Sequence, residues 1–127
     1  MIKKASSEKI YSNLGNAEVL TLVPRGAEKV LDLGCGAGDN AKLILESNSS
    51  AIIHGVTISI QEKLRAERYC GKVVVHNLEH GLPINDISTS YDVVLASHVL
   101  EHICYPSALF VDVKQVLAPD GLFISIA

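Results

Sequence analysis

Alternating glycines between a strand-like run and a helix-like run constrain the fold of this chain more than any other feature. Residues 29–33 form a mostly apolar run, Gly34, Gly36 and Gly38 alternate directly behind it, and residues 39–47 place their apolar side chains on one helical face. Glycine permits a sharp turn and lets a ligand approach main-chain amides, and a helix start adds the positive end of a dipole. We therefore expect a strand, a tight turn that can bind a polar ligand, and a helix, although a turn without a ligand would need the same glycines.

Strand-like and helix-like segments alternate along the rest of the chain. The strand-like segments lack clean polar alternation, which indicates a parallel sheet covered on both faces. We predict an α/β fold, a Rossmann-like doubly wound sandwich with a mainly parallel sheet of about five strands and helices on both faces. Ligands of such sheets bind at the carboxyl ends of the strands. The predicted strands are 29–33, 51–57, 72–76, 91–96 and 122–127, and the predicted helices are 17–23, 39–47, 60–70 and 106–117.

Two short patterns predict where elements begin. Ser59 and Glu62 match a capping box, in which each residue satisfies the backbone amide of the other at the start of a helix. Pro119–Gly121 predicts a turn that leads into the last strand.

The composition fits a single small domain. The chain has 127 residues, of which 48% are hydrophobic and 20% charged, so it contains enough apolar material for a core. A net charge of −3 argues against a general binder of nucleic acids or acidic membranes, and no run approaches the roughly 18–20 apolar residues of a membrane span. Three separated cysteines suit free thiols in a reducing cytosol, so we expect a cytoplasmic protein. We expect residues 1–27 to form a lead-in with a short helix and residues 28–127 to form the sandwich domain.

The glycine spacing narrows the class of ligand. A dinucleotide fingerprint would need a third glycine at the position of Asp39, and a phosphate-binding loop would need a Gly-Lys-Ser/Thr sequence, which is absent. Asp32, just before the turn, would repel a pyrophosphate and attract an ammonium or sulfonium group. The residues therefore favour a cationic ligand and make an NAD-dependent oxidoreductase the weaker alternative.

Several motifs occur in the order and spacing of a known family. Asp32–Gly38 resembles the first motif of the class I S-adenosylmethionine-dependent methyltransferases. Tyr91–Val94 and Ser97–Ile103 resemble the region of that family's fourth strand, and Val116–Gly121 is similar to the turn before its fifth strand. The resemblance covers roughly residues 28–127 and is nearest in kind to the type 11/12-like small-molecule methyltransferases. It implies S-adenosylmethionine as cofactor and a small molecule as methyl acceptor.

The resemblance also implies a cofactor site along the predicted strand ends. The glycine turn would line the methionine part, and Asn77, which can donate and accept hydrogen bonds, would meet the adenine edge. Where the family usually holds the ribose with an acidic residue, this chain has Thr57. A branch similar to the cyclopropane-fatty-acid synthases uses Thr-Leu-Ser followed by a glutamine there, and Gln61 lies one residue earlier than that pattern expects. The implied cofactor-binding residues are Asp32, Gly34, Cys35, Gly36, Gly38, Thr57, Ile58, Asn77, Leu78, Glu79, Ser97 and His98.

Two histidines are the candidate catalytic residues. His98, Glu101 and His102 match the H-x-x-E-H string of a zinc protease family, but this string follows directly on a strand-like run and leaves no room for a long helix before Pro106. We therefore expect no metal. If the acceptor must lose a proton, His98 or His102 is the predicted general base. Partly buried loop histidines without a catalytic role are the alternative.

The end of the sequence predicts an exposed strand. Residues 122–127 form an apolar run with nothing after it, whereas members of the resembling family continue with further strands. At a sheet edge such a strand would leave backbone groups unpaired. We expect a fragment of a longer protein or a chain that self-associates through this strand. A non-catalytic S-adenosylmethionine-binding module that acts with a partner is the alternative to an enzyme.

Overall fold

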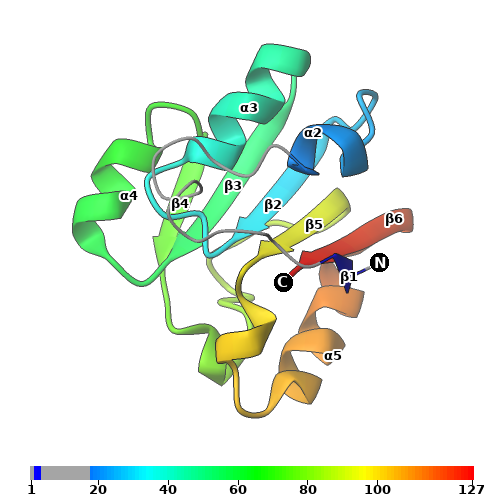
Figure 1. The fold of residues 1–127 in the computed structure, drawn as a ribbon. Coiled ribbons are helices and arrows are strands. Elements are labelled where there is room, and N and C mark those ends of the chain that lie inside the picture. The colour runs from blue at the N-terminus through cyan, green and yellow to red at the C-terminus, as the bar shows by residue number, and fades with distance from the viewer. Residues whose placement is uncertain (1, 4–17) are drawn as a thin grey trace.

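The computed structural model describes residues 2–3 and 18–127 and shows a parallel sheet with helices on both sides (Figure 1). The strands are β1 (Ile2–Lys3), β2 (Lys29–Leu33), β3 (Ile52–Thr57), β4 (Lys72–Val75), β5 (Tyr91–Ser97) and β6 (Leu117–Ile126). They form one six-stranded sheet in the order β1-β6-β5-β2-β3-β4, with every neighbouring pair parallel. This architecture confirms the predicted Rossmann-like doubly wound sandwich.

Each face of the sheet has its own core. The helices are α2 (Glu18–Leu22), α3 (Asp39–Ser47), α4 (Ile60–Ala66) and α5 (Pro106–Val116), and the short 3₁₀ turns are η1 (Leu78–His80) and η2 (Leu100–His102). On one face Val30 and Ile53 pack with buried side chains of α2, α3 and α4. On the other face Leu31 and Val94 pack with buried side chains of α5. Strands covered on both faces need apolar residues at successive positions, which explains the missing polar alternation. Within the described residues, no helix has the length and apolar character that crossing a membrane requires.

The strand order places a topological switch between β2 and β5. The chain runs from β2 outward through β3 to β4 and then returns to the other side of β2 as β5. Leu33 pairs with Val56 of β3 and with Ala96 of β5, so the carboxyl ends of these three strands lie side by side. Connections leave such a switch in opposite directions and open a crevice at the strand ends.

The strand β6 begins at Leu117 rather than at residue 122. Tyr91 pairs with Leu117 whereas Val93 pairs with Leu122, so the residues between them form an irregularity in the ladder. A Cβ at Gly121 would lie 2.8 Å from the carbonyl oxygen of Tyr91, which is why glycine is needed at this close approach. The predicted Pro-Asp-Gly turn thus lies within β6, in the irregular part between the residues that pair with Tyr91 and with Val93, and not before the strand.

Most other boundaries agree with the predicted ones within one residue. The main exception is α4, which ends at Ala66 instead of near residue 70. The amides of Tyr69 and Cys70 both donate to the carbonyl oxygen of Ala66 at 2.9 Å, so the chain closes the helix with turns. The predicted helix start at residue 17 lies outside the described residues.

The last strand is not the outermost one. β1 pairs with β6, with Ile2 opposite Ser125 and Lys3 opposite Ile126. The expectation of an unpaired edge is therefore wrong for this end of β6, because residues from the predicted lead-in supply a neighbouring strand.

Candidate functional site

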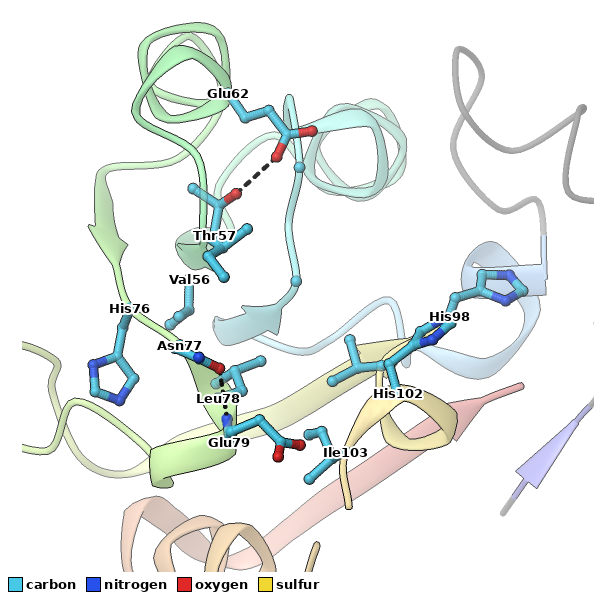
Figure 2. A pocket seen from close by; sticks show the side chains of 14 residues that line it. Val56, Thr57, Glu62, His76, Asn77, Leu78, Glu79, His98, His102 and Ile103 are labelled. Carbon is cyan, nitrogen blue, oxygen red and sulfur yellow. Dashed lines mark hydrogen bonds between the residues drawn. The ribbon is translucent and has the colours of Figure 1, made fainter. Parts of the chain in front are cut away.

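A cavity of about 380 Å³ opens at the carboxyl ends of β2, β3, β4 and β5 (Figure 2). Its walls come from the glycine turn after β2, the connection from β3 into α4, the segment after β4 and the stretch after β5. Figure 2 shows Thr57 and Glu62 together on one side, with Asn77 and His102 on different sides of the space below them. The cavity lies at the edge of the sheet where the strand order predicts a ligand site.

The glycine turn presents bare backbone to the cavity. Gly34, Gly36 and Gly38 have φ angles of 68°, 53° and 94°, a region that favours glycine. A Cβ at Gly34 would lie 2.6 Å from Cγ2 of Val99, and a Cβ at Gly38 would lie 3.0 Å from Cα of Ala66. Gly34 and Gly36 border the cavity, whereas Gly38 is packed against α4.

A hydrogen-bonded pair of side chains forms the wall between β3 and α4. Thr57 Oγ1 donates to Oε1 of Glu62 at 3.0 Å, and the Ser59 amide donates to Thr57 Oγ1 at 3.4 Å (Figure 2). Ser59 Oγ accepts from the Glu62 amide at 3.2 Å, which is one half of the predicted capping box. In place of the other half, the Glu62 carboxylate turns to Thr57 and borders the cavity.

The segment after β4 forms a wall that is held by a local turn. Asn77 Oδ1 accepts from the Glu79 amide at 3.0 Å at the start of η1. Nε2 of His76 lies 3.1 Å from the carbonyl oxygen of Gly81. Since Asn77 Oδ1 already accepts from the Glu79 amide, Asn77 can bind a ligand by donating a hydrogen bond from Nδ2.

The stretch after β5 carries both candidate catalytic histidines. His98 has a φ angle of 58°, which is uncommon for a residue with a Cβ. Its amide donates to the Ile126 carbonyl at 2.7 Å, and its Nδ1 lies 3.6 Å from Oε2 of Glu101. His102 follows in η2 and is exposed at the cavity. Backbone strain of this kind clusters at functional sites. Across residues 2–3 and 18–127, no group of three or more His, Cys, Asp or Glu residues could hold a metal ion.

Asp32 and Cys35 lie behind the glycine turn rather than in the cavity wall. Asp32 is fully buried, and neither carboxylate oxygen has a hydrogen-bond partner in the described part of the chain. Burial raises the pKa of this carboxyl to about 7. A Cβ at Gly55 would lie 2.6 Å from the Cys35 sulfur, and burial, aided by the charge of Asp32, raises the pKa of the Cys35 thiol. Cys35 therefore serves packing and not nucleophilic chemistry.

The structure brings most of the predicted site residues together. Asp32, Cys35, Gly38 and Ser97 do not border the cavity. Those that do are Gly34, Gly36, Thr57, Ile58, Asn77, Leu78, Glu79, His98 and His102.

Sequence reasoning missed five residues that border the cavity: Val56, Glu62, His76, Val99 and Ile103. A signal for Glu62 was present, because it occupies the position where the Thr-Leu-Ser pattern expects a glutamine. Gln61, its neighbour, is exposed and lies outside the cavity wall. No comparable pattern marks His76, which ends an apolar run without any spacing that points to a ligand.

The segment that forms the cavity matches a known protein family. A family model described as a methyltransferase domain matches residues 31–123. The chain belongs to this methyltransferase family. The matched region contains every residue that borders the cavity, and the match confirms the resemblance to class I S-adenosylmethionine-dependent methyltransferases.

Relatives of this methyltransferase-family chain have names that denote different reactions. The cyclopropane-fatty-acyl-phospholipid synthase of Escherichia coli (strain K12) is 33% identical over 99 residues, which cover 76% of this chain and 25% of the synthase. The ubiquinone biosynthesis O-methyltransferase of Glaesserella parasuis serovar 5 (strain SH0165) is 28% identical over 109 residues, which cover 77% of this chain and 44% of that enzyme. A crystal structure of an S-adenosylmethionine dependent methyltransferase from Mesorhizobium loti matches with a TM-score of 0.70 at 26% identity, over 85% of this chain and 50% of that chain. The chain thus spans half or less of the length of these proteins.

Proposed function

We propose that this chain binds S-adenosylmethionine in the cavity at the strand ends and transfers its methyl group to a small-molecule acceptor. The observation that carries the proposal is the glycine turn. Bare backbone at Gly34 and Gly36 borders a cavity at the topological switch of a methyltransferase-family sheet.

The described residues fit such a cofactor. A Cβ at Gly34 would collide with Val99, so this position needs glycine. A Cβ at Gly36 would have only Oε2 of Glu62 within 4 Å, at 3.5 Å, so a ligand can approach the backbone there. The buried Asp32 carboxyl, which lacks a hydrogen-bond partner in the described residues, lies behind the turn. When ionised it supplies a negative potential that favours ammonium and sulfonium groups.

We assign the parts of the cofactor to the walls by their chemistry. Gly34 and Gly36 would take the methionine part. Glu62 would accept hydrogen bonds from the ribose hydroxyls through Oε2, since Oε1 already accepts from Thr57. Asn77 would donate to the adenine edge, and Ile58, which borders the cavity with 71% of its surface exposed, would cover the adenine ring.

When bound, S-adenosylmethionine supplies a methyl group on a sulfonium, so the thioether product leaves without protonation. The chain's contribution is mainly positioning, which can lower a barrier by roughly 7–11 kcal/mol. Where the acceptor is a hydroxyl or an acidic carbon, His98 or His102 would accept the proton that the acceptor loses. Both histidines stand on the wall after β5, away from the pair formed by Thr57 and Glu62 (Figure 2).

The proposal includes a cellular location and a class of binding partner. Three free cysteines support a cytoplasmic location, and a net charge of −3 supports a partner other than a nucleic acid or a membrane. Self-association is proposed only for the part of β6 beyond its pairing with β1, where Leu122 is 47% exposed.

A thermal melt with three ligands tests cofactor binding. S-adenosylmethionine and S-adenosylhomocysteine at 100 times their dissociation constants should each stabilise the fold by about 2.7 kcal/mol, a rise of several degrees in Tm. NAD should give no rise. A folded sample that responds to neither S-adenosyl compound contradicts the proposal. Formation of S-adenosylhomocysteine above the acceptor-free rate, in a panel of phenols and amines, tests the transfer step.

A further inference from the structure

One hydrogen bond joins two walls of the cavity. Oε1 of Glu79 accepts from the backbone amide of Cys104 at 2.8 Å. Glu79 lies in η1 on the adenine wall, and Cys104 follows η2, which carries His102 on the other wall. Hydrogen bonds in which the acceptor is ionised are stronger than neutral ones. A single carboxylate therefore ties the proposed cofactor side to the proposed acceptor side.

The two partners of this bond are anchored differently. The chain just after η1 is fixed to α5, because the Leu82 amide donates to Oδ2 of Asp112 at 2.9 Å. The stretch 98–104 is held at its start by the His98 amide, which donates to the Ile126 carbonyl at 2.7 Å. Its far end is tied to the cavity wall by Glu79. The Glu79 bond therefore joins the η1 segment to the end of this stretch, just before α5 begins at Pro106.

Glu79 is also hydrogen-bonded to a neighbouring residue that borders the cavity. Asn77 borders the cavity, and its Oδ1 accepts from the Glu79 amide at 3.0 Å. A ligand that orders Asn77 and Leu78 would therefore fix the backbone of Glu79 through this turn. The carboxylate of Glu79 would then restrain Cys104 and the adjacent Ile103.

We propose that Glu79 is a positioning residue that couples occupancy of the adenine wall to the placement of the stretch 98–104. The proposal rests on the proposed function, since a ligand must occupy that wall. Glu79 acts through Cys104 rather than by touching the methyl acceptor. Coupling of this kind is reciprocal, so loosening the stretch 98–104 also weakens ligand binding at the adenine wall.

Hydrogen exchange without ligand tests the contact itself. Glu79→Ala removes the acceptor, and Glu79→Gln keeps a neutral one. Glu79 is exposed, so both variants should fold. We expect the Cys104 amide to exchange roughly three- to tenfold faster in Glu79→Ala, with a smaller increase in Glu79→Gln. Asp92→Ala is the matched control, because the Asp92 carboxylate also accepts backbone amides, those of Glu28 and Lys29, and should leave Cys104 unchanged.

Hydrogen exchange with S-adenosylhomocysteine tests the coupling. In the wild-type protein the ligand should slow exchange at residues 34–38 and at 98–104. In Glu79→Ala it should still slow exchange at 34–38 but much less at 98–104, and Glu79→Gln should recover part of the protection at 98–104. Full protection of 98–104 in Glu79→Ala, or an unchanged Cys104 amide without ligand, overturns the proposal. Protection of 34–38 without 98–104 in the wild-type protein contradicts the coupling alone, whereas protection of neither contradicts the proposed function and the coupling with it.

Discussion

The two sides of the cavity hold unusual backbone conformations by different means. On the proposed cofactor side, Gly34 and Gly36 adopt positive φ angles that glycine tolerates, and Ser59 caps the helix that carries Glu62. On the proposed acceptor side, His98 adopts a φ of 58° although it has a Cβ. Residues suited to positive φ angles thus stand on the first side, whereas on the second side the His98 amide is held by the carbonyl oxygen of the distant Ile126. The glycine turn therefore adopts its backbone conformation without strain, whereas His98 adopts a conformation that its own residue type disfavours.

The largest effect is expected from a branched side chain in the glycine turn. A Cβ at Gly36 would lie 3.5 Å from Oε2 of Glu62, so Gly36→Val should fold, but it strains a φ of 53° and fills the ligand's approach. Affinity for S-adenosylhomocysteine should fall roughly 100-fold in calorimetric titration, with an unchanged far-UV circular dichroism spectrum. Gly71→Val, where a Cβ would meet nothing within 4 Å, should bind like the wild-type protein. Wild-type affinity in Gly36→Val would mean that the turn is not a binding wall.

The pH dependence of stability tests the carboxyl behind the cofactor side. The pKa of Asp32 is raised from 3.8 to about 7, so the folded protein holds this proton more tightly than the unfolded chain does. The resulting stability is fully present below the unfolded pKa and is lost as the pH rises through 7. From about pH 5 to about pH 8 this linkage should remove about 2–3 kcal/mol from the unfolding free energy of the wild-type protein. In urea unfolding, the unfolding free energy of Asp32→Asn should not fall over this pH range. An equal fall in the wild-type protein and in Asp32→Asn would show that Asp32 does not cause it.

A smaller effect should distinguish two adjacent residues of α4. Glu62→Ala removes the carboxylate proposed to accept from the ribose, and affinity for S-adenosylhomocysteine should fall roughly tenfold. Gln61→Ala is the matched control, because Gln61 is exposed outside the cavity wall. Calorimetric titration of both variants measures the difference. Equal effects of the two substitutions would exclude Glu62 as a specific contact.

The smallest effect concerns the strained residue on the acceptor side. His98→Gly relieves a positive φ angle and should raise the unfolding free energy by about 0.5 kcal/mol in urea. Ser90→Gly, at a φ of 61° outside the cavity wall, should give a similar gain. A loss of stability in His98→Gly alone would show that the imidazole supports the fold and that the positive φ angle of His98 is not a net strain.

The features that could be predicted from the sequence are those that depend on residues close together in the chain. The strand at 29–33, the glycine turn and the helix at 39–47 are confirmed because each depends on residues close together in the chain. The unpredicted features depend on distant partners. The pairing of β1 with β6 and the bond from Cys104 to Glu79 leave no local pattern. At Glu62 two hydrogen-bond partners compete. Its side chain accepts from Thr57 and does not complete the predicted capping box with Ser59.

Amide chemical shifts during a titration with S-adenosylhomocysteine test the central claim that the strand ends form a cofactor site. The account predicts that the largest changes in a proton–nitrogen correlation spectrum occur at residues 34–38, 57–62 and 76–79, the segments that carry the glycine turn, Glu62 and Asn77. Amides of residues 19–27, at the opposite end of β2, should change little. An absence of changes in the folded protein, or changes concentrated at residues 19–27, would contradict the claim.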